Sequence, residues 1–518
     1  MTFKFKDAPD YNDIENDTIL DLIDIQAKAL PDKLAIKHNK TKVSYHEIAL
    51  FSDHIANFFL KNNFKVQEVI AVSMDRSAEM SLCLLGILKT GAIYLPIDPA
   101  LPVERVQFLM KDASARVLVT SKKYEELYKD FNTIIFDEIW SGRTDDIVPM
   151  ARPVQNENHL AYIIYTSGST GMPKGVGITQ KSLLNLLRFR LHSPGVDSSD
   201  NMLGITTMSF DISEEELYLP LICGAQLTIV DNDIAKDGQA LLETIKSEKI
   251  TIMQATPYVW QMMLEVGWED KLPIKAFCGG EALTKKLANT LMNRCKELWN
   301  MYGPTETTIC SIAKKLDKND DIITIGKPID NTQVYILDDE LNKVAQGVEG
   351  ELYISGAGVS PGYINRPELT AQKFLDDIFS DIPGQKMYRT GDLAKLNEDG
   401  DIQFLGRIDN QVKVRGYRIE TEEIEYHLKE NQNIKDAIVV VHQDLAGNSR
   451  LIAYFTVKRP LTLISDTDLI NTLKNSLKKT LPEYMMPADY LLIAAIPLLP
   501  SGKIDKKALP VPEFNSDQ

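Results

Sequence analysis

The chain contains a loop of small and hydroxyl-bearing residues that is suited to binding phosphate, Tyr165-Thr-Ser-Gly-Ser-Thr-Gly-Met-Pro-Lys-Gly175. Glycine allows close backbone approach, free N–H groups and hydroxyls donate to anionic oxygen, and Lys174 adds positive charge. The loop is not a Walker A motif, because Pro173-Lys174 stands where that motif needs Gly-Lys followed by Ser or Thr. Taken alone, such a loop is typical of either phosphate binding or an ordinary turn.

Three further charged residues lie in tight turns. Glu306 ends the turn Tyr302-Gly-Pro-Thr-Glu306, and one carboxylate together with phosphate oxygens is a common way to hold magnesium. Asp392 ends Arg389-Thr-Gly-Asp392 and can accept two hydrogen bonds. Lys503 follows Ser501-Gly502. Taken alone, the sequence predicts that Glu306 is an acid at a helix N-terminus, that Asp392 is a turn aspartate and that Lys503 is a solvated lysine.

An acidic segment follows Phe210, with Asp211 first and Glu214, Glu215 and Glu216 close behind. A buried carboxylate is costly unless it faces a cation such as an ammonium group. Asp211 is therefore a candidate for binding an amine. Two alternatives stay open: Asp211 caps the helix that begins here, and the three glutamates form a solvated helix face.

The elements that carry these residues alternate between strand-like and helical patterns. Residues 69–73 and 115–120 are predicted strands, with a predicted helix over 78–88 between them, which favours parallel α/β layers. A strand over 160–165 leads directly into the phosphate loop, the position where open α/β sheets bind ligands.

The C-terminal part changes character. Residues 350–401 have short alternating runs that predict a smaller β-rich subdomain, and a compact α+β tail begins after Arg407. The tail is predicted to contain a hairpin, helices over 420–429 and 466–480, and strands over 436–441 and 450–456. The predicted fold is α/β, with a large N-terminal domain (1–408) and a small C-terminal domain (409–518).

Composition narrows the functional classes. A chain of 518 residues is too long for one hydrophobic core. Its 73 acidic and 57 basic residues give a net charge of −16, which opposes nucleic-acid binding. The five cysteines include no CxxC pair, which predicts no zinc site or disulfide framework, and no apolar run approaches the ~18 residues of a membrane span. These features predict a cytoplasmic protein that binds neither nucleic acid nor membrane.

Over nearly its whole length the chain resembles the adenylate-forming superfamily, and most closely the amino-acid adenylation domains of nonribosomal peptide synthetases. The resemblance rests on the phosphate loop and on further motifs in the family's order: Leu88-Lys-Thr-Gly-Ala-Ile-Tyr-Leu-Pro-Ile-Asp98, Phe210-Asp-Ile-Ser213, Asn300-Met-Tyr-Gly-Pro-Thr-Glu306, Gly350-Glu-Leu-Tyr-Ile-Ser-Gly356, Tyr388-Arg-Thr-Gly-Asp-Leu393, Gly406-Arg-Ile-Asp-Asn-Gln-Val-Lys-Val-Arg-Gly-Tyr-Arg418, Leu481-Pro-Glu-Tyr-Met-Met-Pro487 and Ser501-Gly-Lys503.

The resemblance implies an ATP- and Mg²⁺-dependent ligase. It implies that Glu306 is the metal ligand and that Lys503 bridges the substrate carboxylate and the ATP α-phosphate, although the family usually has Asn where this chain has Ser501. It assigns catalytic roles to Lys503, Thr166, Lys174 and Glu306. The implied ATP-binding residues are Thr166, Ser167, Gly168, Ser169, Thr170, Gly171, Lys174, Gly280, Glu281, Asn300, Tyr302, Gly303, Thr305, Asp392 and Arg407.

For the second substrate, the resemblance places Asp211 at the α-amino group of an amino acid. It implies a side-chain pocket formed by Ile212, Glu215, Gln254, Phe277, Gly279, Met301, Ile309 and Cys310, with Lys503 completing the set. A carboxylate in a largely apolar pocket needs a partner. Glu215 therefore predicts a cationic substrate side chain such as that of lysine, ornithine or arginine, with Gln254 accepting a further hydrogen bond.

The resemblance also implies a second half-reaction. Asp409 matches a hinge about which the small domain turns to present residues 412–418 to the site, for transfer of the activated amino acid to the phosphopantetheine thiol of a carrier protein. No carrier signature follows Lys506, so we expect that carrier on another domain or protein, in antibiotic or siderophore biosynthesis. The alternatives are a D-alanine-type carrier-protein ligase, which would need a very small pocket, and an aryl- or acyl-CoA synthetase, which Asp211 disfavours.

Overall fold

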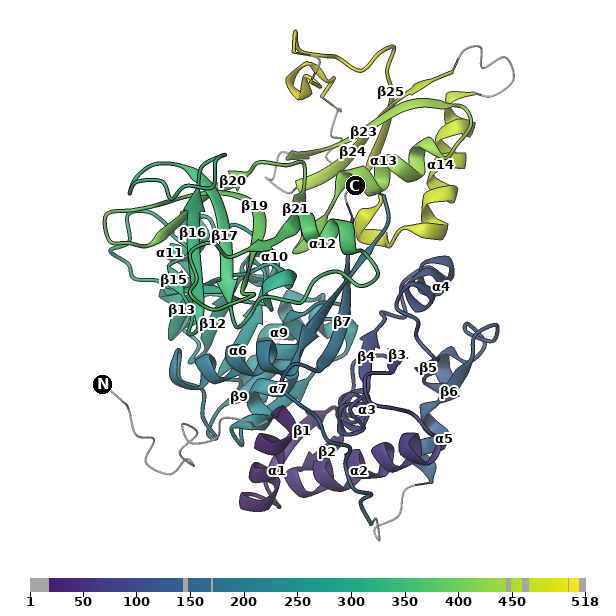
Figure 1. Ribbon diagram of the computed structural model, residues 1–518, viewed down its shortest axis with the longest axis vertical. Coiled ribbons are helices and arrows are strands. Elements are labelled where there is room, and N and C mark those ends of the chain that lie inside the picture. Colours follow the sequence, from purple (N-terminus) through teal and green to yellow (C-terminus); the bar gives the residue numbers. More distant parts are fainter. Residues whose placement is uncertain are drawn as a thin grey trace.

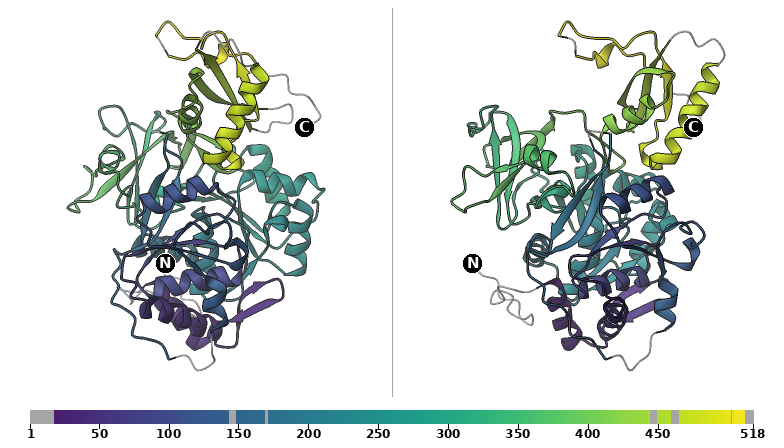
Figure 2. Two further views of the ribbon diagram at one scale, coloured as in Figure 1. Left: turned by 90° about the vertical axis from the view of Figure 1, so that its right-hand side faces the viewer. Right: turned by 45° about the vertical axis from the view of Figure 1, so that its right-hand side comes forward.

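The computed structural model describes residues 18–142, 148–168, 171–443, 449–458, 465–501 and 503–511. Figures 1 and 2 show a large body that contains two mostly parallel sheets, a smaller antiparallel sheet beside it, and a C-terminal α+β unit above both. The predicted α/β class with a smaller C-terminal unit is therefore confirmed.

The first sheet has six strands in the order β6-β5-β3-β4-β7-β8, and the chain crosses it in parallel except at the β7–β8 edge. The predicted strand over 69–73 is β3, and the predicted helix over 78–88 is α3. The elements are β3 (Val69–Ser73), α3 (Ala78–Lys89), β4 (Ile93–Pro96), α4 (Val103–Asp112), β5 (Val117–Thr120), β6 (Thr133–Ile135), α5 (Phe136–Ser141), β7 (Leu160–Thr166) and β8 (Lys174–Thr179).

The second sheet has nine strands in the order β15-β14-β13-β12-β11-β9-β10-β1-β2, with a parallel centre and antiparallel edges. Its strands are β1 (Leu34–His38), β2 (Thr41–Ser44), β9 (Asn201–Gly204), β10 (Gln226–Ile229), β11 (Ile252–Ala255), β12 (Lys275–Cys278), β13 (Glu297–Tyr302), β14 (Ile312–Lys315) and β15 (Lys327–Pro328). Its helices are α1 (Ile19–Ala29), α2 (Tyr45–Lys61), α6 (Gln180–His192), α7 (Ile212–Ile222), α8 (Asn232–Ala235), α9 (Gly238–Ser247), α10 (Pro257–Glu265) and α11 (Lys285–Arg294).

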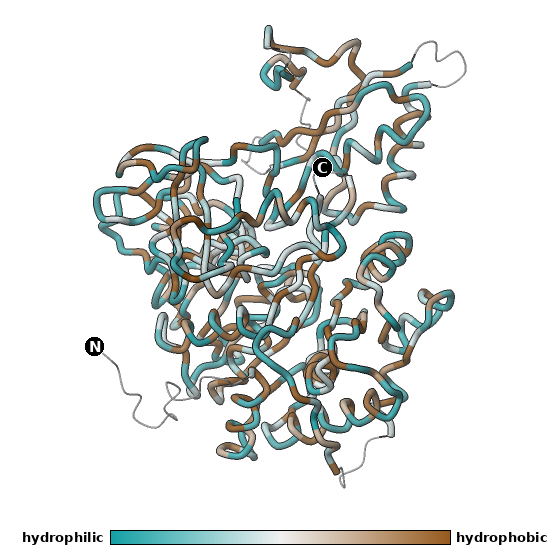
Figure 3. The backbone as a smooth tube through the Cα atoms, in the orientation of Figure 1, coloured by the Kyte–Doolittle hydropathy of each residue, from teal (hydrophilic) through white to brown (hydrophobic). Residues whose placement is uncertain are grey.

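One continuous core joins the two sheets. Helix α3 is buried along its whole length, and its apolar residues pack together with those of α1, α2, α6 and α7. Ser77 starts α3 by accepting a hydrogen bond from the Met80 N–H, which satisfies one of the free donors of the first turn. Figure 3 shows the hydrophobic residues concentrated along the central strands and the hydrophilic ones on outer loops and helices. This core packs α6 and α7 against each other.

The predicted β-rich subdomain is a five-stranded antiparallel sheet. It contains β16 (Thr332–Leu337), β17 (Gly350–Gly356), α12 (Pro367–Lys373), β18 (Phe374–Asp376), β19 (Lys386–Leu396) and β20 (Ile402–Arg407). Strand β19 carries Asp392 and pairs with β20 so that Asp392 lies opposite Arg407. The pairing brings these two predicted nucleotide residues together.

The C-terminal unit has cores of its own, built from residues between Val412 and Leu509. It begins with the hairpin of β21 (Val412–Val414) and β22 (Tyr417–Ile419), followed by α13 (Thr421–Lys429). Strands β23 (Ile434–Gln443), β24 (Ser449–Val457) and β25 (Asp489–Leu492) form a sheet covered by α13 and α14 (Asp466–Thr480). The hairpin, both helices and the strands predicted over 436–441 and 450–456 are all present.

Candidate active site

The phosphate loop connects β7 to the antiparallel strand β8, so it is a hairpin loop rather than a strand-to-helix turn. Gly168 lies so close to the Met172 carbonyl oxygen that a Cβ there would be 1.9 Å from it, and Gly171 has a φ of +87°. Both positions therefore require glycine. The Thr166 hydroxyl is buried without a hydrogen-bond partner among the described residues. Ser169 and Thr170, both predicted to bind phosphate, lie outside the described residues.

Residues of the C-terminal unit lie on this loop. The Gly168 N–H donates to Glu423 Oε2 at 3.1 Å, and the Glu420 N–H donates to Ser167 Oγ at 3.0 Å. Ser167 Oγ in turn donates to the Arg418 carbonyl oxygen at 3.0 Å. Glu423 also pairs with Arg105 of α4 at 2.7 Å, with both side chains buried. In this orientation the Glu423 carboxylate accepts the hydrogen bond of a backbone N–H that a phosphate oxygen would otherwise accept.

Glu306 lies at the centre of a buried charge cluster. Its carboxylate accepts hydrogen bonds from Tyr363 Oη at 2.8 Å and from Arg418 Nη1 at 2.6 Å, and Lys174 Nζ lies 3.7 Å away. Burial raises the pKa of Glu306, but Arg418 and Lys174 outweigh it and hold the pKa well below its usual range. Burial lowers the pKa of Lys174, which Glu306 opposes. Glu306 is therefore an ionised carboxylate, and in this orientation Arg418 and Lys174 balance its charge.

This cluster fits a magnesium ion held by one protein carboxylate. Magnesium usually keeps several waters and binds one or two carboxylates together with substrate phosphates. The Arg418 guanidinium already holds a positive charge against Glu306, next to the phosphate loop. No group of three metal-ligating side chains occurs among the residues that the structure describes, so ATP oxygens and water would supply the remaining ligands.

Three of the predicted ATP-binding residues, Tyr302, Asp392 and Arg407, form a second cluster at the five-stranded sheet. Asp392 accepts hydrogen bonds from Tyr302 Oη and, at 2.8 Å, from Arg407 Nη1. Arg407 also pairs with Asp409 at 2.6 Å, so the predicted hinge residue is tied to the nucleotide cluster. Nearby, Asn300 donates to the Thr324 carbonyl at 2.8 Å.

The segment of Gly280 and Glu281, both predicted to bind ATP, contacts the small unit as well. Gly280 has a φ of +84°, and the neighbouring Glu281 carboxylate accepts a hydrogen bond from the Gly416 N–H. The β21–β22 hairpin thus touches both the phosphate loop and this segment. Phe210 contacts Tyr417 on this hairpin with ring centroids 4.9 Å apart.

Asp211 lies at the start of α7, and its carboxylate makes no capping hydrogen bond to that helix. The capping alternative is therefore not what the structure shows. Burial raises the pKa of Asp211 to about 6, and a hydrogen bond from Thr305 partly opposes this shift. Thr305 precedes Glu306, so the Asp211 carboxylate lies beside the turn that carries Glu306. A partly buried carboxylate without a capping role is a suitable receptor for an ammonium group.

The pKa of Asp211 predicts a pH dependence of amino-acid binding. Because the raised pKa makes Asp211 neutral below pH 6, the KM for the amino acid should rise ~10-fold per pH unit below 6 and be constant above 7. Initial rates at saturating Mg-ATP would measure this. A carboxylic acid lacking the α-amino group is the control, because its KM should not follow Asp211. A flat amino-acid profile between pH 5 and 7 would contradict the assignment.

The side-chain pocket differs from the prediction at its most important residue. Glu215 is fully buried and pairs with Arg190 of α6, with 2.6 Å between Nε and Oε1 and 3.4 Å between Nη2 and Oε2. The interpretation of Glu215 as a carboxylate without a partner is wrong, because the chain itself supplies the cation. Gln254 is buried with its Oε1 unpartnered among the described atoms.

A strained loop brings the rest of this pocket together. Thr308 and Ile309 both have positive φ, 64° and 63°, which is unusual for β-branched residues. The turn packs Cys310 against Gly303, where a Cβ would lie 2.6 Å from the Cys310 Cα. Gly279 is similarly close to Met301, with a built Cβ 3.0 Å from the Met301 carbonyl oxygen. Ile212 is half-buried in the first turn of α7.

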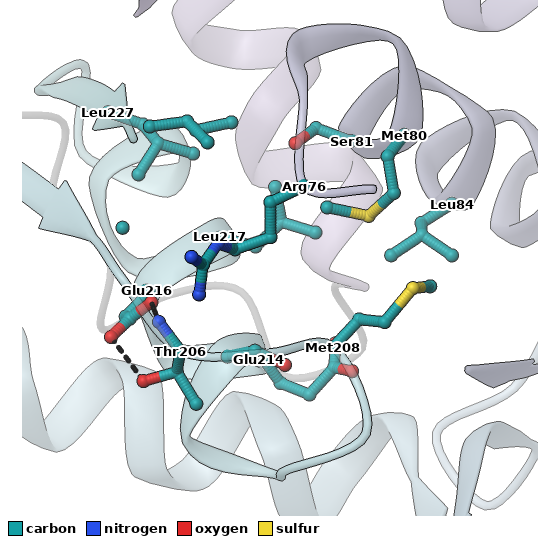
Figure 4. Close-up of a pocket in the computed structure, with 13 residues that line it drawn as sticks. Arg76, Met80, Ser81, Leu84, Thr206, Met208, Glu214, Glu216, Leu217 and Leu227 are labelled. Atoms are coloured by element: carbon teal, nitrogen blue, oxygen red, sulfur yellow. Dashed lines mark hydrogen bonds between the residues drawn. The ribbon is translucent and has the colours of Figure 1, made fainter. Parts of the chain in front are cut away.

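The three consecutive glutamates of α7 do not form a solvated face. All three are buried, and each has a different partner. Glu214 and Glu216 line a cavity together with Arg76 and Met80 (Figure 4). Glu216 accepts hydrogen bonds from Thr206, and Glu214 from Tyr94. Burial raises the pKa of Glu214 to about 8, so this carboxyl is largely protonated at neutral pH.

Lys503 is not brought to the site in this structure. It is exposed, in a turn where its carbonyl oxygen accepts a hydrogen bond from the Leu499 N–H at 2.7 Å. Figures 1 and 2 show this segment on the side of the C-terminal unit that faces away from the large body. The β21–β22 hairpin faces the site instead.

Three residues at the site were not predicted from the sequence: Arg190, Tyr363 and Glu423. Arg190 had a detectable signal, because it follows Leu183 and Leu187 at helical spacing on an apolar face, where a cation needs a partner. Tyr363 and Glu423 had none, because their contacts depend on how distant segments meet.

Comparison with known proteins identifies the family. Residues 23–364 match the model of the AMP-binding enzyme family, and residues 423–503 match that of the AMP-binding enzyme C-terminal domain. The chain therefore belongs to the AMP-binding enzymes, which are adenylate-forming ligases.

Within that family, the chain is similar to adenylation segments of nonribosomal peptide synthetases, as its motifs indicate. It is 38% identical over 505 residues to a dimodular nonribosomal peptide synthase of Bacillus subtilis, covering 96% of this chain and 21% of that protein. It is 36% identical over 511 residues to tyrocidine synthase 1 of Brevibacillus parabrevis, covering 97% and 45%. The chain thus spans less than half the length of either curated relative.

Solved structures agree. A four-domain nonribosomal peptide synthetase bound to AMP and glycine matches with a TM-score of 0.70 and 33% identity, covering 99% of this chain and 38% of that one. An artificially fused adenylation–carrier di-domain from Klebsiella oxytoca matches with a TM-score of 0.81 and 25% identity, covering 92% and 93%. No helix among the described residues is long and apolar enough to cross a membrane.

Proposed function

We propose that this protein activates an α-amino acid with ATP, releasing pyrophosphate, and then transfers the aminoacyl group to the phosphopantetheine thiol of a carrier protein. The observation that carries the proposal is the position of Asp211. Its carboxylate makes no capping hydrogen bond to α7 and lies beside the turn of Glu306. An amino acid whose ammonium binds Asp211 would have its own carboxylate directed toward the nucleotide. The relatives, which are peptide synthetases, support the same function.

In the first half-reaction, a carboxylate oxygen of the amino acid attacks the α-phosphorus and pyrophosphate leaves. The glycine loop, Thr166 and Lys174 would hold the phosphates, while Tyr302, Asp392 and Arg407 would position the nucleoside. Magnesium, when bound at Glu306, would offset phosphate charge. Lys503 would stabilise the negative charge that develops between the carboxylate and the α-phosphate.

In the second half-reaction, the thiol attacks the acyl carbon and loses its proton, and AMP leaves. The present orientation supports this step, because residues 412–419 face the site while Lys503 lies away from it. The first step needs the opposite arrangement: Gly168 and Glu306 can serve phosphates and magnesium only after Glu423 and Arg418 withdraw. We therefore propose that the small domain, residues 409–518, turns about Asp409 between the two steps.

Glu423 provides a test of this rotation. Glu423→Gln weakens its contacts with Arg105 and the Gly168 N–H, which hold the present orientation. We expect transfer from preformed adenylate to a pantetheine thiol to slow by roughly 10-fold, which corresponds to about 1.4 kcal/mol, with pyrophosphate exchange unchanged or faster. Glu430→Gln, just beyond the same helix, is the control, because Glu430 is exposed and pairs only with His427 among the described residues. Equal loss in both steps would contradict the proposed orientation change.

The direct test of the proposed function is amino-acid-dependent ATP–pyrophosphate exchange with the purified protein and the proteinogenic amino acids in turn. At least one should stimulate exchange, and its des-amino analogue should stimulate it only weakly. A CoA thioester formed from an aryl or fatty acid, with no response to any amino acid, would establish the acyl-CoA synthetase alternative instead.

The Arg190–Glu215 pair removes the reason for predicting a basic substrate, because Glu215 already has a cationic partner. A lysine or ornithine side chain would reach Glu215 only by displacing Arg190 from a fully buried ion pair.

The partners, location and pathway are also proposals. The proposed partners are an amino acid and a carrier protein, the proposed location is the cytoplasm, where ATP is available, and the proposed pathway produces an antibiotic or siderophore peptide.

A further inference from the structure

Arg190 lies inside the predicted side-chain pocket rather than behind it. Its Nη1 donates to Met301 Sδ at 3.1 Å, and its guanidinium carbon lies 5.5 Å from the centre of the Phe277 ring. Cys310 adjoins the same guanidinium. Four of the eight predicted pocket residues, including Glu215, therefore contact one side chain that comes from another helix. The arginine occupies volume that the substrate would otherwise use.

The Arg190–Glu215 pair lies close to the proposed ammonium site along the helix. Asp211 and Glu215 are four residues apart at the start of α7, so their Cα atoms are separated by about one helical turn, or ~5–6 Å. A substrate whose ammonium lies on Asp211 would therefore have this pair as a neighbour one turn further along α7. Both partners are fully buried and pack against Phe277 and Met301, so the pair has no room to swing aside without repacking the core.

The charge of the pocket is balanced without a substrate. Glu215 is compensated by Arg190, and proximity to Glu215 raises the pKa of Arg190 despite its burial. A cationic substrate side chain would lie beside the Arg190 guanidinium, while Glu215 is already paired with that arginine. An acidic substrate side chain would lie beside the Glu215 carboxylate. Either would add an uncompensated charge to a buried site, which is strongly unfavourable.

We infer that Arg190 is a specificity-determining residue, which closes the pocket together with Glu215 and restricts the substrate to an amino acid with a short, uncharged side chain. This inference rests on the proposed amino-acid adenylation. It replaces the basic substrate predicted from Glu215 alone, and it extends the pocket by a position that lies 25 residues before Glu215 on another helix.

The wild-type protein gives the first test, a pyrophosphate-exchange panel. Glycine, alanine, serine or threonine should lead, with lysine, ornithine, arginine, leucine and phenylalanine lower by ~10²-fold or more. A basic or large side chain in the lead would overturn the inference while leaving the adenylation proposal intact. No exchange with any amino acid would refute the adenylation proposal, and the inference with it.

Two variants test the residue itself. Arg190→Ala opens the pocket and leaves Glu215 unpaired, so lysine or ornithine should gain ~10-fold or more relative to the best short substrate. The double variant Arg190→Met/Glu215→Leu keeps the pocket filled and uncharged, which guards against misfolding from a single buried charge. It should still favour short uncharged side chains over lysine, because no carboxylate is exposed.

The matched control is Lys89→Met/Asp53→Leu, which removes an ion pair between the buried Lys89 of α3 and the partly buried Asp53 of α2, outside the pocket. Its substrate ranking should equal that of the wild type. If Arg190→Ala folds, as judged by its melting temperature and AMP binding, but keeps the wild-type ranking, Arg190 does not determine specificity. If Arg190→Ala fails to fold, the ranking of the double variant decides: a gain of lysine there would contradict the inference.

Discussion

Replacing Lys503 with alanine is expected to lower amino-acid-dependent pyrophosphate exchange by ~10²-fold or more, the scale of losing one strong electrostatic contact in a transition state. The reason is that a cation between two reacting anions stabilises the transition state more than the ground state. Transfer of the aminoacyl group from preformed adenylate should change little, because the exposed turn that carries Lys503 belongs to a segment on the far side of the C-terminal unit from the large body in the orientation described here.

Lys507→Ala is the matched control for Lys503, since it removes another exposed lysine of the same segment. It should leave both half-reactions as in the wild type. Equal losses of exchange and transfer in Lys503→Ala would contradict the assignment of the lysine to the first step, and an unaffected exchange rate would contradict its catalytic role altogether.

Replacing Asp211 with alanine is expected to nearly abolish amino-acid-dependent exchange. The change leaves the substrate ammonium without its counter-charge, a loss of roughly 3–5 kcal/mol for a buried pair, or about 10²–10⁴-fold. The structure strengthens this expectation, because Asp211 has no capping role whose loss would destabilise α7 instead. Exchange rates and the melting temperature should be measured together.

Des-amino carboxylic acids provide the internal control for Asp211. They should be poor substrates of the wild type and should lose relatively little in the variant. Equal losses for amino acids and des-amino acids, or a large fall in melting temperature, would show that Asp211 acts through the structure of the helix start and not through the ammonium.

The parts of the site that could be predicted from the sequence are those carried by short, local motifs. The phosphate loop, Glu306 and Asp211 each lie in a turn or at a helix start whose geometry follows from a few neighbouring residues. Asp392 is predicted in a turn and instead lies within strand β19, where it pairs with β20 opposite Arg407. The alternation of strands and helices likewise predicted the α/β class, because burial of whole strands leaves a local pattern.

The parts that could not be predicted depend on contacts between distant segments. The sequence Glu214-Glu215-Glu216 resembles a solvated face, yet Tyr94, Arg190 and Thr206 reach the three side chains from three different elements. A carboxylate can be buried only where another segment supplies a hydrogen-bond or ion-pair partner, and the sequence of α7 alone does not show whether one does. The contact of Glu423 with Gly168 depends further on the orientation of the small domain.

The most direct test of the central claim is a single-turnover experiment that identifies the enzyme-bound intermediate by mass. With ATP, magnesium and the amino acid that leads the exchange panel, the protein should form one equivalent of aminoacyl-AMP and release one of pyrophosphate. Adding a pantetheine thiol should then convert the intermediate to a thioester and AMP. Formation of ADP in place of pyrophosphate, or an adenylate that forms only with acids lacking an amino group, would contradict the account.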